Sequence, residues 1–311
     1  MAEARPRIGW IGCGRMGTAM AKRLVDAGVD LSVTNRTRSK ADVLGAMGAT
    51  VVNAPKDLAS CEIVFIMVSA NEDLVDVTSG PNGVLGDPDS APQIIVDCST
   101  VSSETSAAVR SACSERRVGF LAAPVSGNPK VVASGQLTLA VSGTTEAFER
   151  VRPYFNYFGN GVTYVGDGEV ARLVKICHNM MLGIVTQAMA EITVLAERGG
   201  IKRSAWLAFL NDSVMGSTFT RYKSPAFVNL DFKATFTPVL LRKDFDLGMA
   251  AAHDLDVSMP VSALCTEIVK NAIGAGYVHE DFAVLLLEAA RGAGLRLEAE
   301  NLSIDDGLGA T

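Results

Sequence analysis

A lysine within a strongly apolar stretch is the first residue whose setting could support chemistry. Lys175 follows Leu173 and Val174 and precedes Ile176 and Cys177. Burial disfavours an ammonium, so a lysine held among apolar side chains can exchange a proton near neutral pH. Alternatively, its ammonium extends to solvent along the apolar surface. The surrounding residues alone leave both interpretations open.

Two polar residues accompany this lysine at helical spacing. Asn179 lies one turn after Lys175, and His178 lies near the same face. A lysine, an amide and an imidazole on one face could together bind a hydroxyl or carbonyl oxygen and a neighbouring group. For His178, a histidine satisfied within the helix is the alternative. If Lys175 is held for chemistry rather than extended to solvent, this grouping suits proton transfer at an oxygen-bearing carbon.

A glycine-rich segment near the N-terminus indicates a second kind of chemistry. It lies between an apolar strand pattern and a helical pattern and reads Gly12-Cys13-Gly14-Arg15-Met16-Gly17. The first glycine permits a tight turn, the second lets the backbone approach a pyrophosphate, and the third lets helix and strand pack closely. The helix N-terminus then offers unpaired N–H groups to the anion. This order of features predicts a dinucleotide site.

The residues after the second strand bear on which dinucleotide binds. NAD-selective sites usually place an acid there for the ribose 2′-hydroxyl, but this chain has Asn35, Arg36 and Thr37. Arg36 could pair with a 2′-phosphate and stack on the adenine. We therefore predict a preference for NADP(H). The alternative is that these are solvated surface residues.

Four stretches in order resemble the β-hydroxyacid dehydrogenase family. This family includes 3-hydroxyisobutyrate dehydrogenase, tartronate semialdehyde reductase and, more distantly, 6-phosphogluconate dehydrogenase. The resemblance spans residues 8 to about 290. It is carried by Ile8-Gly-Trp-Ile-Gly-Cys-Gly-Arg-Met-Gly17, Asp97-Cys-Ser-Thr100, Ala123-Pro-Val-Ser-Gly127, and Lys175-x-x-x-Asn179 followed by Lys243-Asp244.

The resemblance implies a role for each matching position. Lys175 corresponds to the catalytic lysine, a general base in oxidation and a general acid in reduction, with Asn179 orienting it. The substrate carboxylate is expected at Ser126 and Gly127. The remaining positions are expected near the cofactor: Thr100 beside the nicotinamide and substrate, Lys243 near both, and Val68, Ser69 and Ala70 near the ribose.

Three departures from the family pattern bear on the substrate. Asn128 replaces the second glycine of a Ser-Gly-Gly sequence, and it either contacts substrate or only caps the loop. His178 replaces an asparagine, as in 6-phosphogluconate dehydrogenase, and could bind a polar group of a hydroxylated or amino-bearing acid. However, the glutamate that follows in that enzyme is Leu182 here. Oxidative decarboxylation is therefore the alternative rather than the main interpretation.

The elements that must position these residues fall into two predicted domains. Residues 1–167 alternate strand and helix signals, which predicts a Rossmann-type parallel sheet with helices on both faces. A long connecting helix over 168–199 begins an all-helical second domain, 168–311, which binds substrate and forms oligomers. Further helices are predicted over Arg203–Asn211, Pro238–Leu255, Pro260–Ala275 and His279–Gly292, with a mobile tail from Leu297.

Composition bounds the remaining possibilities. With 28 basic and 34 acidic residues, the net charge of −6 gives no reason to expect nucleic acid or an anionic membrane as partner. The six cysteines form no C-x-x-C pair or zinc spacing, so we predict reduced thiols in a cytoplasmic protein and no metal. No signal peptide is expected at the polar N-terminus.

Oligomerisation and two other function classes complete the predictions. The long helix is apolar on more than one side, which favours a homodimer, and the family resemblance implies a homodimer or homotetramer. An imine reductase would share the architecture, but that class generally lacks the lysine. A non-catalytic NADP-binding protein would tend to lose Lys175, Asn179 and Lys243, which this chain keeps.

Overall fold

The protein divides into two compact units within its long helix. The computed structural model describes residues 6–159 and 161–309. The first unit ends at Lys175 and the second begins at Ile176. The predicted domain boundary lies a little earlier, at the start of the helix. The units are described separately below.

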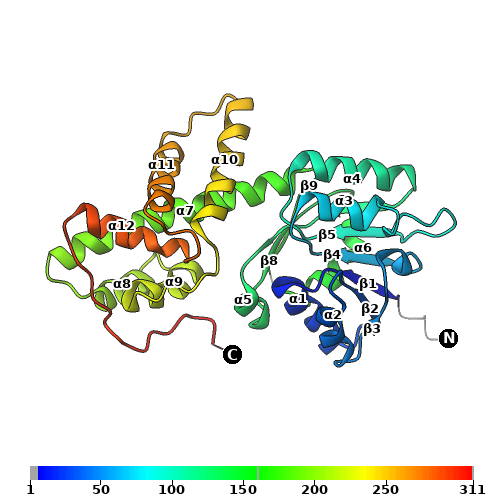
Figure 1. The fold of residues 1–311 in the computed structure, drawn as a ribbon, viewed down its shortest axis with the longest axis horizontal. Coiled ribbons are helices and arrows are strands. Elements are labelled where there is room, and N and C mark those ends of the chain that lie inside the picture. The colour runs from blue at the N-terminus through cyan, green and yellow to red at the C-terminus, as the bar shows by residue number, and fades with distance from the viewer. Residues whose placement is uncertain (1–5, 160, 310–311) are drawn as a thin grey trace. The chain divides into compact units, whose positions relative to one another are not determined.

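The first unit is built on a mainly parallel sheet with the strand order β3-β2-β1-β4-β5-β6-β8-β7 (Figure 1). Neighbours from β3 to β6 are parallel; β8 is antiparallel to β6 and β7, and parallel to β9 on its other edge. The strands are β1 (Ile8–Ile11), β2 (Leu31–Thr34), β3 (Thr50–Val51), β4 (Ile63–Ile66), β5 (Ile94–Asp97), β6 (Gly119–Ala122), β7 (Val125–Ser126), β8 (Thr138–Ser142) and β9 (Gly161–Gly166).

Continuous apolar strands explain why helices cover both faces of this sheet. β1, β4 and β5 are buried at every position, so each face needs its own apolar cover. One core contains Trp10, Phe65 and Phe155, and the other contains Val64 and Val109. The covering segments are α1 (Arg15–Asp26), α2 (Arg38–Gly45), η1 (Pro55–Leu58), α3 (Asn71–Ser79), α4 (Ser103–Glu115), α5 (Pro129–Ala133) and α6 (Thr145–Phe155). The predicted fold class is confirmed.

The second unit is helical throughout the part of residues 176–309 that forms regular structure. Its core contains Phe227, Phe245 and Phe282. A Cβ atom on Gly183 would lie 2.5 Å from the Phe245 ring, which explains the glycine inside the long helix. The helices are α7 (Val170–Arg198), which begins in the first unit, α8 (Arg203–Asp212), α9 (Thr218–Asn229), α10 (Pro238–Asp254), α11 (Pro260–Gly274), η2 (Phe282–Val284) and α12 (Leu285–Gly292).

Two helical segments differ from the sequence predictions. No helix is predicted from the sequence over the residues of α9. Its interior Pro225 is an unfavourable residue for a helix, and a capping box between Ser217 and Thr220 starts it. The helix predicted from His279 begins only at Leu285, after a short 3₁₀ turn capped by Asp281.

Helix α7 behaves as a core helix. By length and composition it could cross a membrane, but half of its most apolar window is buried. The tail also packs: residues 297–309 form no helix or strand, yet Asn229 exchanges two hydrogen bonds with the backbone of Leu302, at 2.8 and 3.0 Å. Leu297 and Ile304 pack against the second unit's core. The prediction of a mobile tail is therefore wrong, because sequence patterning does not reveal this docking.

Candidate active site

The glycine-rich loop joins β1 to α1 with the geometry that a dinucleotide requires. Gly12 has a φ of +98°, and a Cβ atom there would lie 2.2 Å from the carbonyl oxygen of Met67. A Cβ atom on Gly17 would lie 2.0 Å from the carbonyl oxygen of Gly12. Gly14, the N-cap of α1, instead faces open space, with no atom within 4 Å of its Cβ position. The loop leaves room for a pyrophosphate at the helix N-terminus.

This arrangement predicts different effects for two alanine substitutions in the loop. Gly17→Ala should lower the free energy of unfolding by about 1–3 kcal/mol, because its methyl group overlaps packed backbone. Gly14→Ala should leave the melting temperature nearly unchanged but weaken NADPH binding at least about tenfold, since its methyl group occupies the pyrophosphate space. Thermal unfolding and fluorescence titration with NADPH separate the two effects. Normal NADPH affinity in Gly14→Ala would contradict this placement.

Asn35 connects the loop to the end of β2. Its Oδ1 accepts a hydrogen bond from the Cys13 backbone N–H at 2.8 Å, and its Nδ2 donates to the Thr37 carbonyl at 2.9 Å. The side chain therefore fixes the loop, and its contact with the cofactor stays a prediction. Burial raises the pKa of the Cys13 thiol to about 11, so the loop carries no thiolate to repel an anion.

Arg36 lies at the surface beyond the end of β2. Its side chain is 87% exposed, and its Nη1 lies 2.9 Å from the Asp73 carboxylate. Such an exposed ion pair contributes little and can be exchanged for another anion. Thr37 is the N-cap residue of α2 and makes no side-chain capping bond. These positions could accommodate a 2′-phosphate at the edge of the sheet.

The loops after β4 and β5 are joined by Ser99. Its Oγ accepts a hydrogen bond from the Val68 N–H at 2.9 Å, and its own N–H donates to Asp97 at 2.9 Å. This contact brings the segment Val68-Ser69-Ala70 alongside the segment that ends at Thr100. Because these strands are parallel, both segments lie at the edge of the sheet that carries the glycine loop. Ser69 and Thr100 are exposed there.

The segment Ser126-Gly127-Asn128 makes a sharp turn after β7. Gly127 has a φ of +141°, and a Cβ atom there would lie 2.8 Å from Val131 Cγ1. The Asn128 Oδ1 accepts hydrogen bonds from the N–H groups of Lys130 and Val131, at 2.9 and 3.2 Å, and caps α5. Of the two interpretations of Asn128, capping is the one observed. Any substrate contact would use its amide N–H groups or the backbone.

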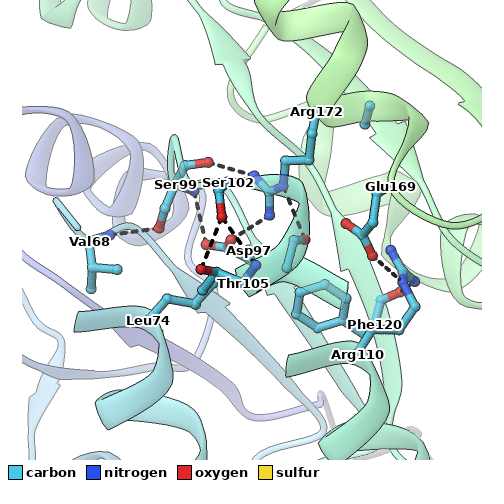
Figure 2. A network of polar contacts seen from close by, with 12 residues as sticks. Val68, Leu74, Asp97, Ser99, Ser102, Thr105, Arg110, Phe120, Glu169 and Arg172 are labelled. Carbon is cyan, nitrogen blue, oxygen red and sulfur yellow. Dashed lines mark hydrogen bonds and ion pairs between the residues drawn. The ribbon is translucent and has the colours of Figure 1, made fainter. Parts of the chain in front are cut away.

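Helix α7 carries Lys175, which is half-buried. One turn earlier, Arg172 forms a buried ion pair with Asp97, with 2.5 Å between Nη2 and Oδ2 (Figure 2). Its Nη1 donates to the Ser99 carbonyl at 2.6 Å, and its Nε donates to Ser106 Oγ at 3.1 Å. The helix that bears Lys175 is thereby tied to the carboxyl end of β5.

In the second unit, a chain of polar contacts holds the residues that follow Lys175 in α7. The Asn179 Nδ2 donates to the buried Asp244 carboxylate at 2.6 Å, and the Asn179 Oδ1 lies 3.1 Å from His178 Nδ1. Asp244 therefore sets the orientation of the Asn179 amide, and that amide favours the His178 tautomer with a proton on Nδ1. Lys243 is exposed on α10.

Sequence reasoning assigned no role to Arg172, Asp97 or Asp244. Asp97 and Asp244 lay within the stretches that resemble the family, so these stretches were the available signal. For Arg172 the sequence offers no such signal, because an arginine near the start of a helix is usually exposed to solvent. No group of three or more His, Cys, Asp or Glu within residues 6–159 and 161–309 could hold a metal ion.

Comparison with known proteins identifies the family. Residues 7–166 match the model for the NAD binding domain of 6-phosphogluconate dehydrogenase, and residues 166–288 match the model described as NAD-binding of NADP-dependent 3-hydroxyisobutyrate dehydrogenase. Glyoxylate/succinic semialdehyde reductase 2 of Arabidopsis thaliana is 30% identical over 287 residues, which cover 91% of this chain and 80% of that protein. The chain belongs to the β-hydroxyacid dehydrogenase family.

Two further members of the β-hydroxyacid dehydrogenase family support this assignment. The NAD-dependent L-serine dehydrogenase of Pseudomonas aeruginosa is 28% identical over 288 residues, covering 90% of this chain and 96% of that protein. A structure of Mycobacterium tuberculosis 3-hydroxyisobutyrate dehydrogenase with L-serine has a TM-score of 0.78 at 25% identity, covering 92% of this chain and 99% of that one. The predicted resemblance is confirmed, and with it a nicotinamide cofactor.

Proposed function

We propose that this protein is an NADP(H)-dependent dehydrogenase of a small β-hydroxyacid, or a reductase of the corresponding semialdehyde or keto acid. Lys175 is its general acid/base. The nicotinamide, when bound, supplies or accepts the hydride. Lys175 moves the proton of the substrate hydroxyl, and Asn179 orients Lys175 and the substrate. Ser126, Gly127 and Asn128 bind the carboxylate, largely through backbone N–H groups.

The observation that carries this proposal is the contact of Asn179 with buried Asp244, 2.6 Å apart. On the continuous helix α7, Asn179 lies one turn beyond Lys175. Burying the Asp244 carboxylate costs free energy, which its hydrogen bond from the Asn179 amide partly offsets, and the same bond holds that amide in one orientation. Here the fixed amide places a hydrogen-bonding group beside the position of the lysine, as proton transfer to a bound oxygen requires.

The choice of NADP(H) rests on the end of β2. No acid follows this strand, and Arg36 presents its guanidinium to solvent at the sheet edge, 87% exposed. The relative from Pseudomonas aeruginosa is named as NAD-dependent, so the cofactor must be measured. We expect kcat/KM with NADPH to exceed that with NADH by about tenfold or more, and Arg36→Leu to remove most of this preference. Equal values for the two cofactors in the natural protein would contradict the assignment.

A substrate panel tests the function itself. It comprises 3-hydroxyacids, serine- and threonine-like compounds and small semialdehydes, each assayed with NADPH or NADP⁺ by absorbance at the nicotinamide band. Turnover of at least one compound that depends on its carboxylate is expected. Tight NADPH binding without turnover of any compound would instead support a non-catalytic NADP-binding protein.

Two other enzyme reactions remain as outcomes of the same panel. Release of carbon dioxide during oxidation would reveal decarboxylation of the β-keto product, as in 6-phosphogluconate dehydrogenase. Leu182 stands where that enzyme has a glutamate, which disfavours this outcome. Turnover of cyclic imines in place of semialdehydes would indicate an imine reductase, which Lys175 disfavours.

We also propose that the protein assembles as a homodimer or homotetramer through its second unit. Several apolar side chains there are exposed, including Leu195 (67%), Phe209 (69%) and Leu264 (63%), and large exposed apolar groups commonly mark interfaces. Light scattering after gel filtration should give at least twice the monomer mass, and a mass near 32.7 kDa would refute this assembly.

The expected cellular setting follows from cysteine usage and charge. Six cysteines are unpaired, five of them buried, as is usual for a protein in a reducing compartment. We therefore propose a cytoplasmic location. The net charge of −6 gives no electrostatic reason for binding to nucleic acid or to an anionic membrane.

A further inference from the structure

Arg172 is a charged residue in an unusual setting, because 2% of its side chain is exposed although it lies at the start of a helix. Each of its three guanidinium nitrogens is committed to a partner within the first unit. Two of these partners are the Asp97 carboxylate at 2.5 Å and the Ser99 carbonyl at 2.6 Å (Figure 2). The third is Ser106 Oγ at 3.1 Å. A planar guanidinium held at three points has one orientation.

The partners of Arg172 belong to the edge of the sheet where the cofactor loops lie. Asp97 ends β5, and Ser99 holds the Val68 backbone at 2.9 Å. Thr100, which is expected beside the nicotinamide, follows directly in the chain. Lys175 is three residues after Arg172 on α7, on the same side of the helix. One guanidinium thus connects the turn that bears the lysine to the loops that are expected to hold the cofactor.

We infer that Arg172 is the positioning residue for Lys175. By locking the first turn of α7 to Asp97 and Ser99, it fixes both the rotation of the helix and its advance along its axis. The lysine ammonium then meets the substrate oxygen in a reactive geometry. This inference rests on the proposed role of Lys175 as general acid/base.

A purely structural explanation accounts less well for this cluster. A buried ion pair is weak support for stability, and apolar residues of similar volume often serve as well. Ala171, the neighbour of Arg172, is already fully buried, so the first turn of α7 has apolar contact without the charge. The hydrogen bonds of Arg172 with Asp97, Ser99 and Ser106 form only when all four residues keep one arrangement. Such a network therefore holds a fixed geometry.

Arg110 on α4 provides a matched control at the same end of α7. Its Nε lies 2.6 Å from Glu169 Oε1, and its other nitrogens donate to the carbonyls of Gly168 and Phe120, at 2.6 and 2.7 Å. It anchors the residues that precede α7. The contacts that the structure gives for it include none to Asp97, Ser99 or the loops after β4 and β5.

The test combines Arg172→Lys with Lys175→Met in a double-mutant cycle. Arg172→Lys keeps the positive charge but loses the planar guanidinium with its several N–H donors. The resulting small displacement of Lys175 should lower kcat by roughly 10- to 100-fold. NADPH affinity should change by less than about threefold. In the Lys175→Met background, the same substitution should have no further effect on the single-turnover rate, because Arg172 acts through Lys175. Arg110→Lys should lower the melting temperature and leave kcat unchanged.

Each outcome is decisive. Near-normal kcat in folded Arg172→Lys, or an equal loss in both backgrounds, would overturn the inference. If Arg172→Lys does not fold, the uncharged pair Arg172→Gln with Asp97→Asn replaces it in the cycle, and full activity of that pair would likewise overturn the inference. If Lys175→Met alone keeps normal kcat, the proposed function fails rather than the role of Arg172.

Discussion

Replacing Lys175 with methionine is expected to lower kcat by about 10²- to 10⁴-fold, the usual contribution of a general acid/base. Methionine keeps the apolar part of the side chain, so the packing of α7 should persist. NADPH affinity should be nearly unchanged, because the dinucleotide is expected to bind at the glycine loop and the ends of β2, β4 and β5. Steady-state kinetics and fluorescence titration with NADPH measure the two quantities.

A surface lysine supplies the control for this substitution. Lys270 on α11 pairs with Glu267 at 2.8 Å, and its side chain is 44% exposed. Lys270→Met should leave kcat unchanged. Near-normal kcat in Lys175→Met would refute the catalytic role. Partial recovery of Lys175→Ala by added primary amines would support it independently, since a free amine can replace the missing proton carrier.

Asp281→Ala is expected to lower the free energy of unfolding of the second unit by about 3–5 kcal/mol, because it leaves a buried ammonium without its partner. The Asp281 carboxylate lies 2.5 Å from Lys223 Nζ, and both side chains are almost fully buried. It also accepts hydrogen bonds from Thr235 Oγ1 at 2.6 Å and the Ala283 N–H at 3.0 Å. Denaturant unfolding followed by circular dichroism measures the change.

Two further variants compare the contribution of this buried ion pair to the free energy of unfolding with that of an exposed pair. Glu267→Ala breaks the exposed pair with Lys270 and should lower the free energy of unfolding by roughly 1 kcal/mol or less. The double variant Lys223→Met with Asp281→Leu should be more stable than Asp281→Ala, because no unpaired charge remains. A loss below about 1 kcal/mol in Asp281→Ala would contradict this description of the pair.

The ion pair of Lys223 with Asp281 also makes the free energy of unfolding depend on pH. Burial alone would raise the pKa of Asp281, but the Lys223 ammonium and several hydrogen bonds lower it below its ordinary value. A carboxyl with a lower pKa in the folded state contributes stability above its unfolded pKa, and this contribution is lost as pH falls through the folded pKa. The Lys223→Met, Asp281→Leu variant lacks this pH-dependent contribution, so its free energy of unfolding should fall less between neutral and acid pH than that of the natural protein.

Parts of the candidate site could be predicted because they depend on local sequence. The glycine loop requires only a strand, three small residues and a helix start, which are contiguous in the chain. Gly12 with φ +98° and Gly17 packed on the Gly12 carbonyl have the geometry that this spacing predicts. The sequence is compatible with two roles for Asn128, and only its bonds to the N–H groups of Lys130 and Val131 identify it as a cap.

Other parts could not be predicted, because their partners are far apart in the chain. Arg172 and Asp97 are separated by 75 residues, Asn179 and Asp244 by 65, and Lys223 and Asp281 by 58. No periodicity or spacing rule connects such residues. Asn179 is predicted as a site residue from the family resemblance, but its buried partner is not, and burial decides the energetic effect of each of these pairs.

The sequence by itself determined the fold class, the dinucleotide loop and the apolar helix that bears Lys175, since periodicity and glycine spacing are local properties of the chain. Tertiary structure alone decided which charges are buried and what they hold. Arg172 ties α7 to β5, and Asp244 orients Asn179. Arg203, 1% exposed, pairs with Glu197 and donates to the carbonyls of Val228 and Glu298, which secures the tail. Desolvation is a property of the packed neighbourhood, so it exists only once distant segments meet.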